Sequence, residues 1–299
     1  MPGYFRRHWQ GDLPLAVAWW LNGIALTALS IAIPRQEWFV AAVGTIDAAG
    51  EFTAFLLVGL FAMLLVPAWQ VIGLYRAGDR HIATVGTILA GRLVQSGTTV
   101  LALLLALRFL IFAAEAYSGA RIAYPIGTDA RIVPSHGGRV LDVDAGFRFG
   151  LAAQVEAALD RNPRVRRLRL TSGGGALSEA VKLRKLILER QLDTEATSLC
   201  ASACVSAFIA GQQRLLHRRA RIGLHLPRNT GFGLRGPVSP FYAAELVYFS
   251  QRGVPDWFLD RWIATGRTFW YPAPSQLREA GLVTAFVGRP RPADEVYYR

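Results

Sequence analysis

Three long apolar segments in the first 118 residues constrain the fold more than any other feature of this chain. They cover residues 13–33, 52–75 and 93–114. An apolar helix of roughly 20 residues crosses the hydrocarbon core of a bilayer, and Pro67 should kink the second helix without ending it. The sequence therefore predicts a three-helix transmembrane region over residues 1–118, in contact with the lipid bilayer. Charges become frequent after it, and residues 119–299 are expected to form a soluble domain.

The basic residues of the N-terminal half predict its orientation. Arg6 and Arg7 precede the first segment, and Arg76, Arg80 and Arg92 follow the second. Loops rich in Lys and Arg stay in the cytoplasm, and no small-residue cleavage site follows the first segment, so it is expected to remain as an anchor. We expect a multi-pass protein of the bacterial inner membrane with its C-terminal domain periplasmic or otherwise extracytoplasmic. Arg108, inside the third segment, should snorkel to the interface or pair with Glu115.

The net charge of +12 raises the question of a nucleic-acid partner. All the basic residues except Lys182 and Lys185 are Arg, which is typical of a coding bias. The densest cluster, residues 164–169, alternates Arg with apolar residues and is typical of a strand with one solvated face. No nucleic-acid partner is expected, and anionic lipid headgroups are the second interpretation.

The soluble half alternates strand-like and helical patterns. Period-two or compact apolar stretches predict strands, and apolar residues at helical spacing predict helices. Strands are expected at 139–144, 166–171, 195–199 and 221–225, and helices at 147–159, 177–192 and 203–210. This order predicts an α/β domain with a mainly parallel sheet and flanking helices.

Three local features carry candidate chemistry, and each is ambiguous alone. Gly173, Gly174 and Gly175 follow a strand and open a helix, so their N–H groups could approach a ligand or simply form a tight turn. Ser202 stands between a strand and a helix and could be a nucleophile or a helix N-cap. His225 ends a strand, where a lone His is more often structural.

The remaining His residues of the soluble half, His136 and His217, are alternative bases. The order and spacing of the glycine turn, Ser202 and His225 favour His225 as the base over His136 and His217. They resemble the proteolytic subunit of Clp protease and the wider ClpP/crotonase superfamily, which includes membrane-bound signal peptide peptidases. The family's motifs are matched by SGGG (172–175, with Gly173 in place of proline), CASACVSAFIAG (200–211), ARIGLHLP (220–227) and EAGLVTAF (279–286).

The resemblance, which covers roughly residues 130–287, implies a serine peptidase. Ser202 would attack a peptide carbonyl and His225 would accept its proton. N–H groups of Gly174 or Gly175 and of Ala203 would stabilise the oxyanion. The substrate would be a peptide or a membrane-protein segment, and a homo-oligomer is expected. No cofactor and no metal is expected.

The chain departs from the family at the third catalytic residue. The family's Asp would fall near Thr268 or Phe269, where no carboxylate stands. Asp256 and Asp260 could substitute only if their helix turned them inward. The site is then a Ser–His dyad, a site with another orienting group, or a weakened site. Lys182 and Lys185 could supply a Ser–Lys variant, although the solvated face of a helix is the simpler interpretation.

Cys200 and Cys204 flank the candidate nucleophile. At positions i and i+4 they could form a disulfide, which an oxidising periplasm would permit, or remain two buried thiols. Two other functions stay open on the sequence. The domain could be a catalytically inactive binding or scaffold module, which the missing Asp favours. It could also be a crotonase-like acyl-transfer enzyme, which needs the glycine turn without the Ser202–His225 pair.

Overall fold

The computed structural model describes residues 3–33, 49–124, 130–226, 240–266 and 268–288. They fall into two compact units, one built from residues 3–33 and 50–119 and the other from the chain after residue 119. We describe each unit by itself.

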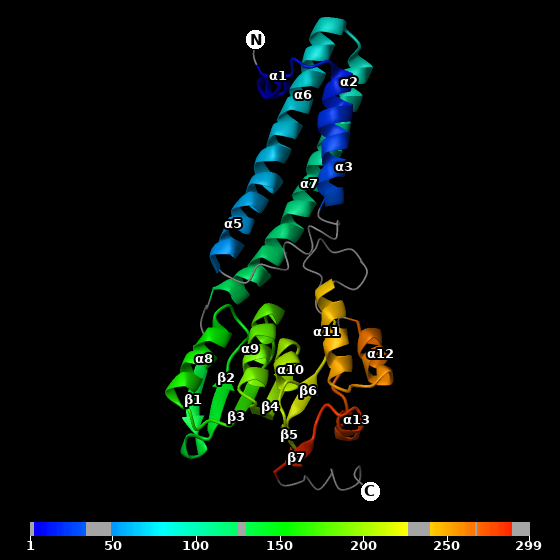
Figure 1. Ribbon diagram of the computed structural model, residues 1–299. Coiled ribbons are helices and arrows are strands. Elements are labelled where there is room, and N and C mark those ends of the chain that lie inside the picture. The colour runs from blue at the N-terminus through cyan, green and yellow to red at the C-terminus, as the bar shows by residue number, and fades with distance from the viewer. Residues whose placement is uncertain (1–2, 34–48, 125–129, 227–239, 267, 289–299) are drawn as a thin grey trace. The chain divides into compact units, whose positions relative to one another are not determined.

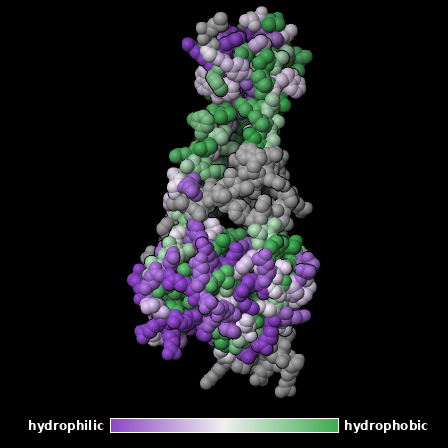
Figure 2. Space-filling model, in the orientation of Figure 1, coloured by the Kyte–Doolittle hydropathy of each residue, from purple (hydrophilic) through white to green (hydrophobic). Residues whose placement is uncertain are grey.

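The first unit is helical. Its elements are α1 (Tyr4–Gln10), α2 (Leu15–Val17), η1 (Ala18–Ala25), α3 (Leu26–Ala32), α5 (Ala49–Leu60), η3 (Phe61–Leu65), α6 (Val66–Val85) and α7 (Ile88–Ala123). Three stretches, Leu15–Ala32, Gly50–Val85 and Ile88–Ala114, are helical, long and apolar enough to cross a membrane. Figure 2 shows the apolar side chains along these helices in green. Three long apolar helices are therefore present where the sequence predicted them.

The second and third helices are longer than predicted. Residues 76–92, expected as a polar connection, are largely helical, and the chain turns only at Gly86 and Thr87. Gly86 adopts the positive φ of +79° that ends α6. Pro67 lies at the start of α6, directly after the π-helical turn η3. A wider turn accommodates the missing N–H of proline and its ring, so the helix continues through this position.

Arg108 on α7 binds the end of α3. Its guanidinium donates hydrogen bonds to the Ser30 hydroxyl at 2.7 Å and to the Ser30 carbonyl oxygen. The charge is thus solvated by a carbonyl in the last turn of α3, a contact that was not predicted. The alternative partner, the Glu115 side chain, lies outside the described residues.

The second unit is an α/β domain (Figure 1). Its strands are β1 (Arg131–Ser135), β2 (Val140–Asp144), β3 (Arg167–Ser172), β4 (Asp193–Ala201), β5 (Arg214–His217), β6 (Arg221–Gly223) and β7 (Ala285–Val287). Its helices are η4 (His136–Gly138), α8 (Leu151–Arg161), α9 (Leu177–Glu189), α10 (Ala203–Phe208), α11 (Pro240–Gln251), α12 (Asp256–Ala264) and α13 (Pro274–Glu279). The strand order is β1-β2-β3-β4-β5-β7, and β6 pairs with the second half of β4. Every pairing is parallel except that of the edge strand β1 with β2.

Successive side chains of β3 point alternately to the two faces of the sheet. Leu168 and Leu170 are buried in a core that α8, α9 and α10 also line. Arg167 and Arg169 point to the other face, where both pair with Glu195 on β4, at 3.2 Å and 3.4 Å. The Arg-rich segment is therefore a partly exposed strand face held by ion pairs. The predicted fold class, an apolar helical region followed by a mainly parallel sheet with flanking helices, is confirmed.

Candidate active site

The three sequence features meet at one edge of the sheet. β3, β4 and β6 are neighbouring parallel strands, so their carboxyl ends lie side by side. The glycine turn follows β3, Ser202 follows β4, and His225 follows β6 after one further residue. The edge beyond the carboxyl ends of parallel strands is where ligands bind in open α/β sheets.

Ser202 occupies a sharp turn between β4 and α10. Its backbone angles, φ 54° and ψ −126°, lie in a region that L-residues rarely adopt. The N–H of Ser202 donates to the Gly223 carbonyl at 2.8 Å, which connects the turn to β6. Its side chain makes no capping hydrogen bond to α10. The hydroxyl is therefore presented away from the helix, as in the strained elbows that carry hydrolase nucleophiles.

The hydroxyl of Ser202 is paired with the imidazole of His225. The distance from Ser202 Oγ to His225 Nε2 is 2.8 Å. The other ring nitrogen, Nδ1, lies 2.7 Å from the Leu226 carbonyl oxygen. A carbonyl can only accept, so Nδ1 carries the proton, and Nε2 is left to accept the Ser202 hydroxyl proton. The backbone thus selects the tautomer that a general base requires.

The imidazole is also held by aromatic residues. The ring of Phe269 packs on His225 with centroids 4.3 Å apart. Trp262 donates its indole N–H to the His225 carbonyl oxygen at 3.2 Å. Phe269 is one of the two positions where the family's Asp was expected, so an aromatic ring occupies this side of the base. Nothing in the sequence motifs indicated this contact.

The glycine turn lies directly against Ser202. A Cβ atom on Gly174 would stand 2.6 Å from Cβ of Ser202, and one on Gly175 would stand 2.2 Å from the Phe147 carbonyl oxygen. Both glycines have positive φ, +102° and +143°. Side chains are therefore excluded at both positions by space and by backbone conformation.

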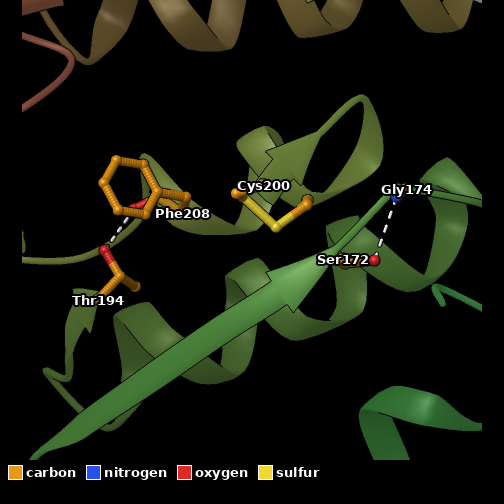
Figure 3. Close-up of a disulfide and its surroundings, with 6 residues drawn as sticks. Ser172, Gly174, Thr194, Cys200 and Phe208 are labelled. Atoms are coloured by element: carbon orange, nitrogen blue, oxygen red, sulfur yellow. Dashed lines mark hydrogen bonds between the residues drawn. A yellow bond between two sulfur atoms is a disulfide. The ribbon is translucent and has the colours of Figure 1, made fainter. Parts of the chain in front are cut away.

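The two glycines differ in whether their N–H groups already donate to another group. The N–H of Gly174 donates to the Ser172 hydroxyl at 3.1 Å (Figure 3). Among the residues that the structure describes, neither the Gly175 N–H nor the Ala203 N–H donates to another group. Of the pair Gly174 or Gly175, the geometry favours Gly175, with Ala203 as the second donor. The Gly174 N–H instead fixes the shape of the turn.

A disulfide joins Cys200 and Cys204 across the Ser202 turn, with Cα atoms 5.3 Å apart. Cys200 is the penultimate residue of β4, Cys204 lies in the first turn of α10, and both are fully buried. Cys200 is aligned with Ser172 of β3, and Figure 3 shows the bridge beside the glycine turn. The bridge therefore ties together the two elements whose junction positions Ser202.

The other candidate residues lie elsewhere. Asp256 and Asp260 are exposed on α12, whose buried side chains are Phe258, Leu259 and Trp262, so the helix does not turn them inward. Lys182 pairs with Glu179 at 3.1 Å, and Lys185 lies 3.7 Å from Glu189. His136 bonds the Ser135 hydroxyl in the β1–β2 connection, and His217 accepts from the Arg219 N–H.

Solved structures similar to this chain include two of ClpP1 and one of a peptidase. ClpP1 from Listeria monocytogenes matches with 14% identity and a TM-score of 0.44, covering 51% of this chain and 93% of that protein. A point mutant of the same Listeria protein matches with 12% identity and a TM-score of 0.40 over the same shares. A peptidase from Plasmodium falciparum matches with 8% identity and a TM-score of 0.41, covering 51% and 97%. No family model and no curated protein sequence matches the chain.

At these identities the likeness concerns the fold alone.

Proposed function

We propose that this chain is a membrane-anchored serine endopeptidase of the ClpP-like type, with Ser202 as nucleophile and His225 as general base. The observation that carries the proposal is the 2.8 Å hydrogen bond between Ser202 Oγ and His225 Nε2. A crotonase-like acyl-transfer enzyme would use the glycine turn without this pair, so the pair favours the peptidase.

The geometry supports a two-stage reaction. Ser202 Oγ attacks the scissile carbonyl carbon while its proton passes to His225 Nε2. The oxyanion accepts hydrogen bonds from the N–H groups of Gly175 and Ala203. The imidazolium then gives the proton to the leaving nitrogen, and the C–N bond breaks to leave an acyl-Ser202 ester. His225 Nε2 then takes a proton from water, which attacks the ester, and returns that proton to Ser202 Oγ as the acyl C–O bond breaks.

The disulfide and the membrane helices support an extracytoplasmic site. Disulfides persist in oxidising compartments and are rare in the cytoplasm. Three spans with a cytoplasmic N-terminus would place the domain after residue 119 on the opposite side, the periplasmic side of a bacterial inner membrane. Peptides and membrane-protein segments at that surface are the proposed substrates. A homo-oligomer, which the resemblance implies, stays a prediction that cross-linking in membranes would check.

A fluorophosphonate probe tests the chemistry, because it reacts with an activated serine hydroxyl. We expect the full-length protein to be labelled at Ser202 and the His225→Ala variant to lose the label. His217→Ala is the matched control, because it removes an imidazole from the same domain and should keep the label. Folded protein that takes no label would refute the peptidase and favour a scaffold. A reporter enzyme fused after Arg299 tests the orientation, and activity confined to the cytoplasm would refute it.

A further inference from the structure

Two aromatic side chains extend the site beyond His225. The segment around Trp270 pairs with the end of β6, where Leu224 and Trp270 exchange hydrogen bonds of 2.8 and 2.7 Å. Trp270 packs on Phe258 in the core, with ring centroids 4.8 Å apart. Alternation along an extended chain then places Phe269 and Tyr271 on the opposite side, the side of His225.

Phe269 and Tyr271 form a stacked aromatic platform. Their ring centroids lie 5.9 Å apart with 18° between the planes, and each residue is 41% exposed. A Cβ on Gly223 would stand 2.8 Å from Tyr271, 3.0 Å from Ala201 Cβ and 3.3 Å from Phe269. The rings therefore lie over Gly223 and within reach of the residue that precedes the nucleophile.

The position of the platform relative to Ser202 determines which part of a bound substrate it would contact. A hollow of about 410 Å³ opens on the other side of Ser202, between the ends of β2 and β3, lined by Asp144, Ser172 and Gly173 among others. In the order β2, β3, β4, β6 the hollow and the platform flank the nucleophile. The leaving nitrogen must lie at His225 to receive its proton, and Phe269 contacts that imidazole.

We propose that Phe269 and Tyr271 form a specificity subsite for a large apolar or aromatic side chain on the amine side of the scissile bond. The inference rests on the proposed peptidase activity. It adds to that proposal the class of substrate residue that follows the scissile bond. Aromatic pairs prefer offset or edge-to-face contact. The Arg221 guanidinium lies 4.7 Å over the Tyr271 ring, and Tyr271 still leaves 41% of its surface exposed for such a contact. A Phe residue at this position should therefore be favoured over Ala.

The preference for the residue on the amine side can be measured without knowing the natural substrate. p-Nitrophenyl acetate acetylates Ser202 and releases p-nitrophenol, and an added amine then competes with water for the ester. The amine nitrogen forms the new C–N bond, the C–O bond to Ser202 breaks, and His225 carries the amine proton to Ser202 Oγ. With equal phenylalaninamide and alaninamide, mass spectrometry gives the ratio of the two acetylated products. Products formed with the Ser202→Ala variant are subtracted as background.

The wild-type ratio should exceed the intrinsic ratio of the two amines about three- to tenfold, the range expected for one aromatic contact. Tyr271→Ala should bring the ratio close to the intrinsic value, and Tyr271→Phe should restore it. Trp257→Ala is the matched control, because Trp257 is 40% exposed and its α12 side chain packs edge-on against Phe258. It should leave the ratio unchanged.

The outcomes separate the two proposals. Both amides form from one acyl-enzyme, so a weakened dyad changes both yields and leaves their ratio intact. A ratio that Tyr271→Ala does not change, in a protein that is acetylated at Ser202, overturns the subsite alone. A protein that is neither acetylated nor labelled by a fluorophosphonate at Ser202 overturns the peptidase and the subsite with it.

Discussion

The backbone of Ser202 leads to a stability prediction that is independent of any substrate. Ser202→Ala and Ser202→Gly both remove the hydroxyl and its hydrogen bond to His225, so they differ only in the Cβ atom. A residue with a Cβ at φ 54° and ψ −126° costs on the order of 1–3 kcal/mol. Glycine relieves this cost but loses about 0.5–1 kcal/mol of backbone entropy on folding. The Gly variant should therefore be more stable than the Ala variant by about 1 kcal/mol.

Thermal unfolding of the full-length protein in detergent, followed by tryptophan fluorescence, would measure the difference. For a domain of this size, 1 kcal/mol corresponds to about 2–4 °C in Tm. At an unstrained position the entropy term would act alone, and the Gly variant would be the less stable one. A Gly variant equal to or less stable than the Ala variant would therefore refute the strained turn at Ser202.

Three further predictions follow from neighbouring contacts. Gly174→Ala places a Cβ 2.6 Å from the Ser202 Cβ and should reduce fluorophosphonate labelling at least tenfold. Gly173→Ala is the control, because its Cβ would have no atom within 4 Å, and it should keep the labelling. Equal labelling of the two variants would contradict the packing. Reducing the Cys200–Cys204 bridge, which closes a ring of five residues, should lower the free energy of unfolding by about 2 kcal/mol. The Cys200→Ala/Cys204→Ala variant should not respond to reductant, and a response would assign the effect elsewhere. Burial, with Glu245 nearby, raises the pKa of Tyr242 far above its usual value of about 10. The folded state therefore resists ionisation of Tyr242, so its stabilisation is complete below about pH 10 and is lost as pH rises beyond it; Tyr242→Phe should flatten that alkaline decline in urea titrations, and an unchanged decline would contradict this assignment.

The fold class could be predicted because local patterns and long-range pairing agree. The segments expected at 166–171 and 177–192 correspond to β3 and α9 within a few residues. β1 was missed because Pro134 interrupts its pattern, and an edge strand tolerates such a residue. β5 and β7 were missed because each has only three or four residues, and their pairing with distant strands forms them. The prediction for residues 76–92 was wrong because their polarity was taken to indicate a loop. A helix can continue beyond the thickness of a bilayer, as Gly50–Val85 and α7 do here.

The candidate site also contains residues that the sequence predicted and contacts that it did not. Gly174, Ser202 and His225 could be grouped because their order and spacing resemble the motifs of the ClpP/crotonase superfamily. The structure brings them together because each follows a strand, and neighbouring parallel strands end at one edge. The contact of Phe269 with His225 could not be predicted, because it depends on the pairing of Leu224 with Trp270, a tertiary contact without a sequence motif. The binding of Arg108 to Ser30 was missed for the same reason: the partner lies 78 residues away.

A strained backbone persists only where its surroundings leave it no alternative. At Ser202 three restraints act on different atoms: the disulfide fixes both flanks, the Gly223 carbonyl holds the N–H, and His225 holds the hydroxyl. The first of these needs an oxidising compartment, and the other two do not. Export of the domain would therefore complete the restraint of the nucleophile turn, so the compartment that we propose for this site and the geometry that we propose for its chemistry depend on the same two cysteines.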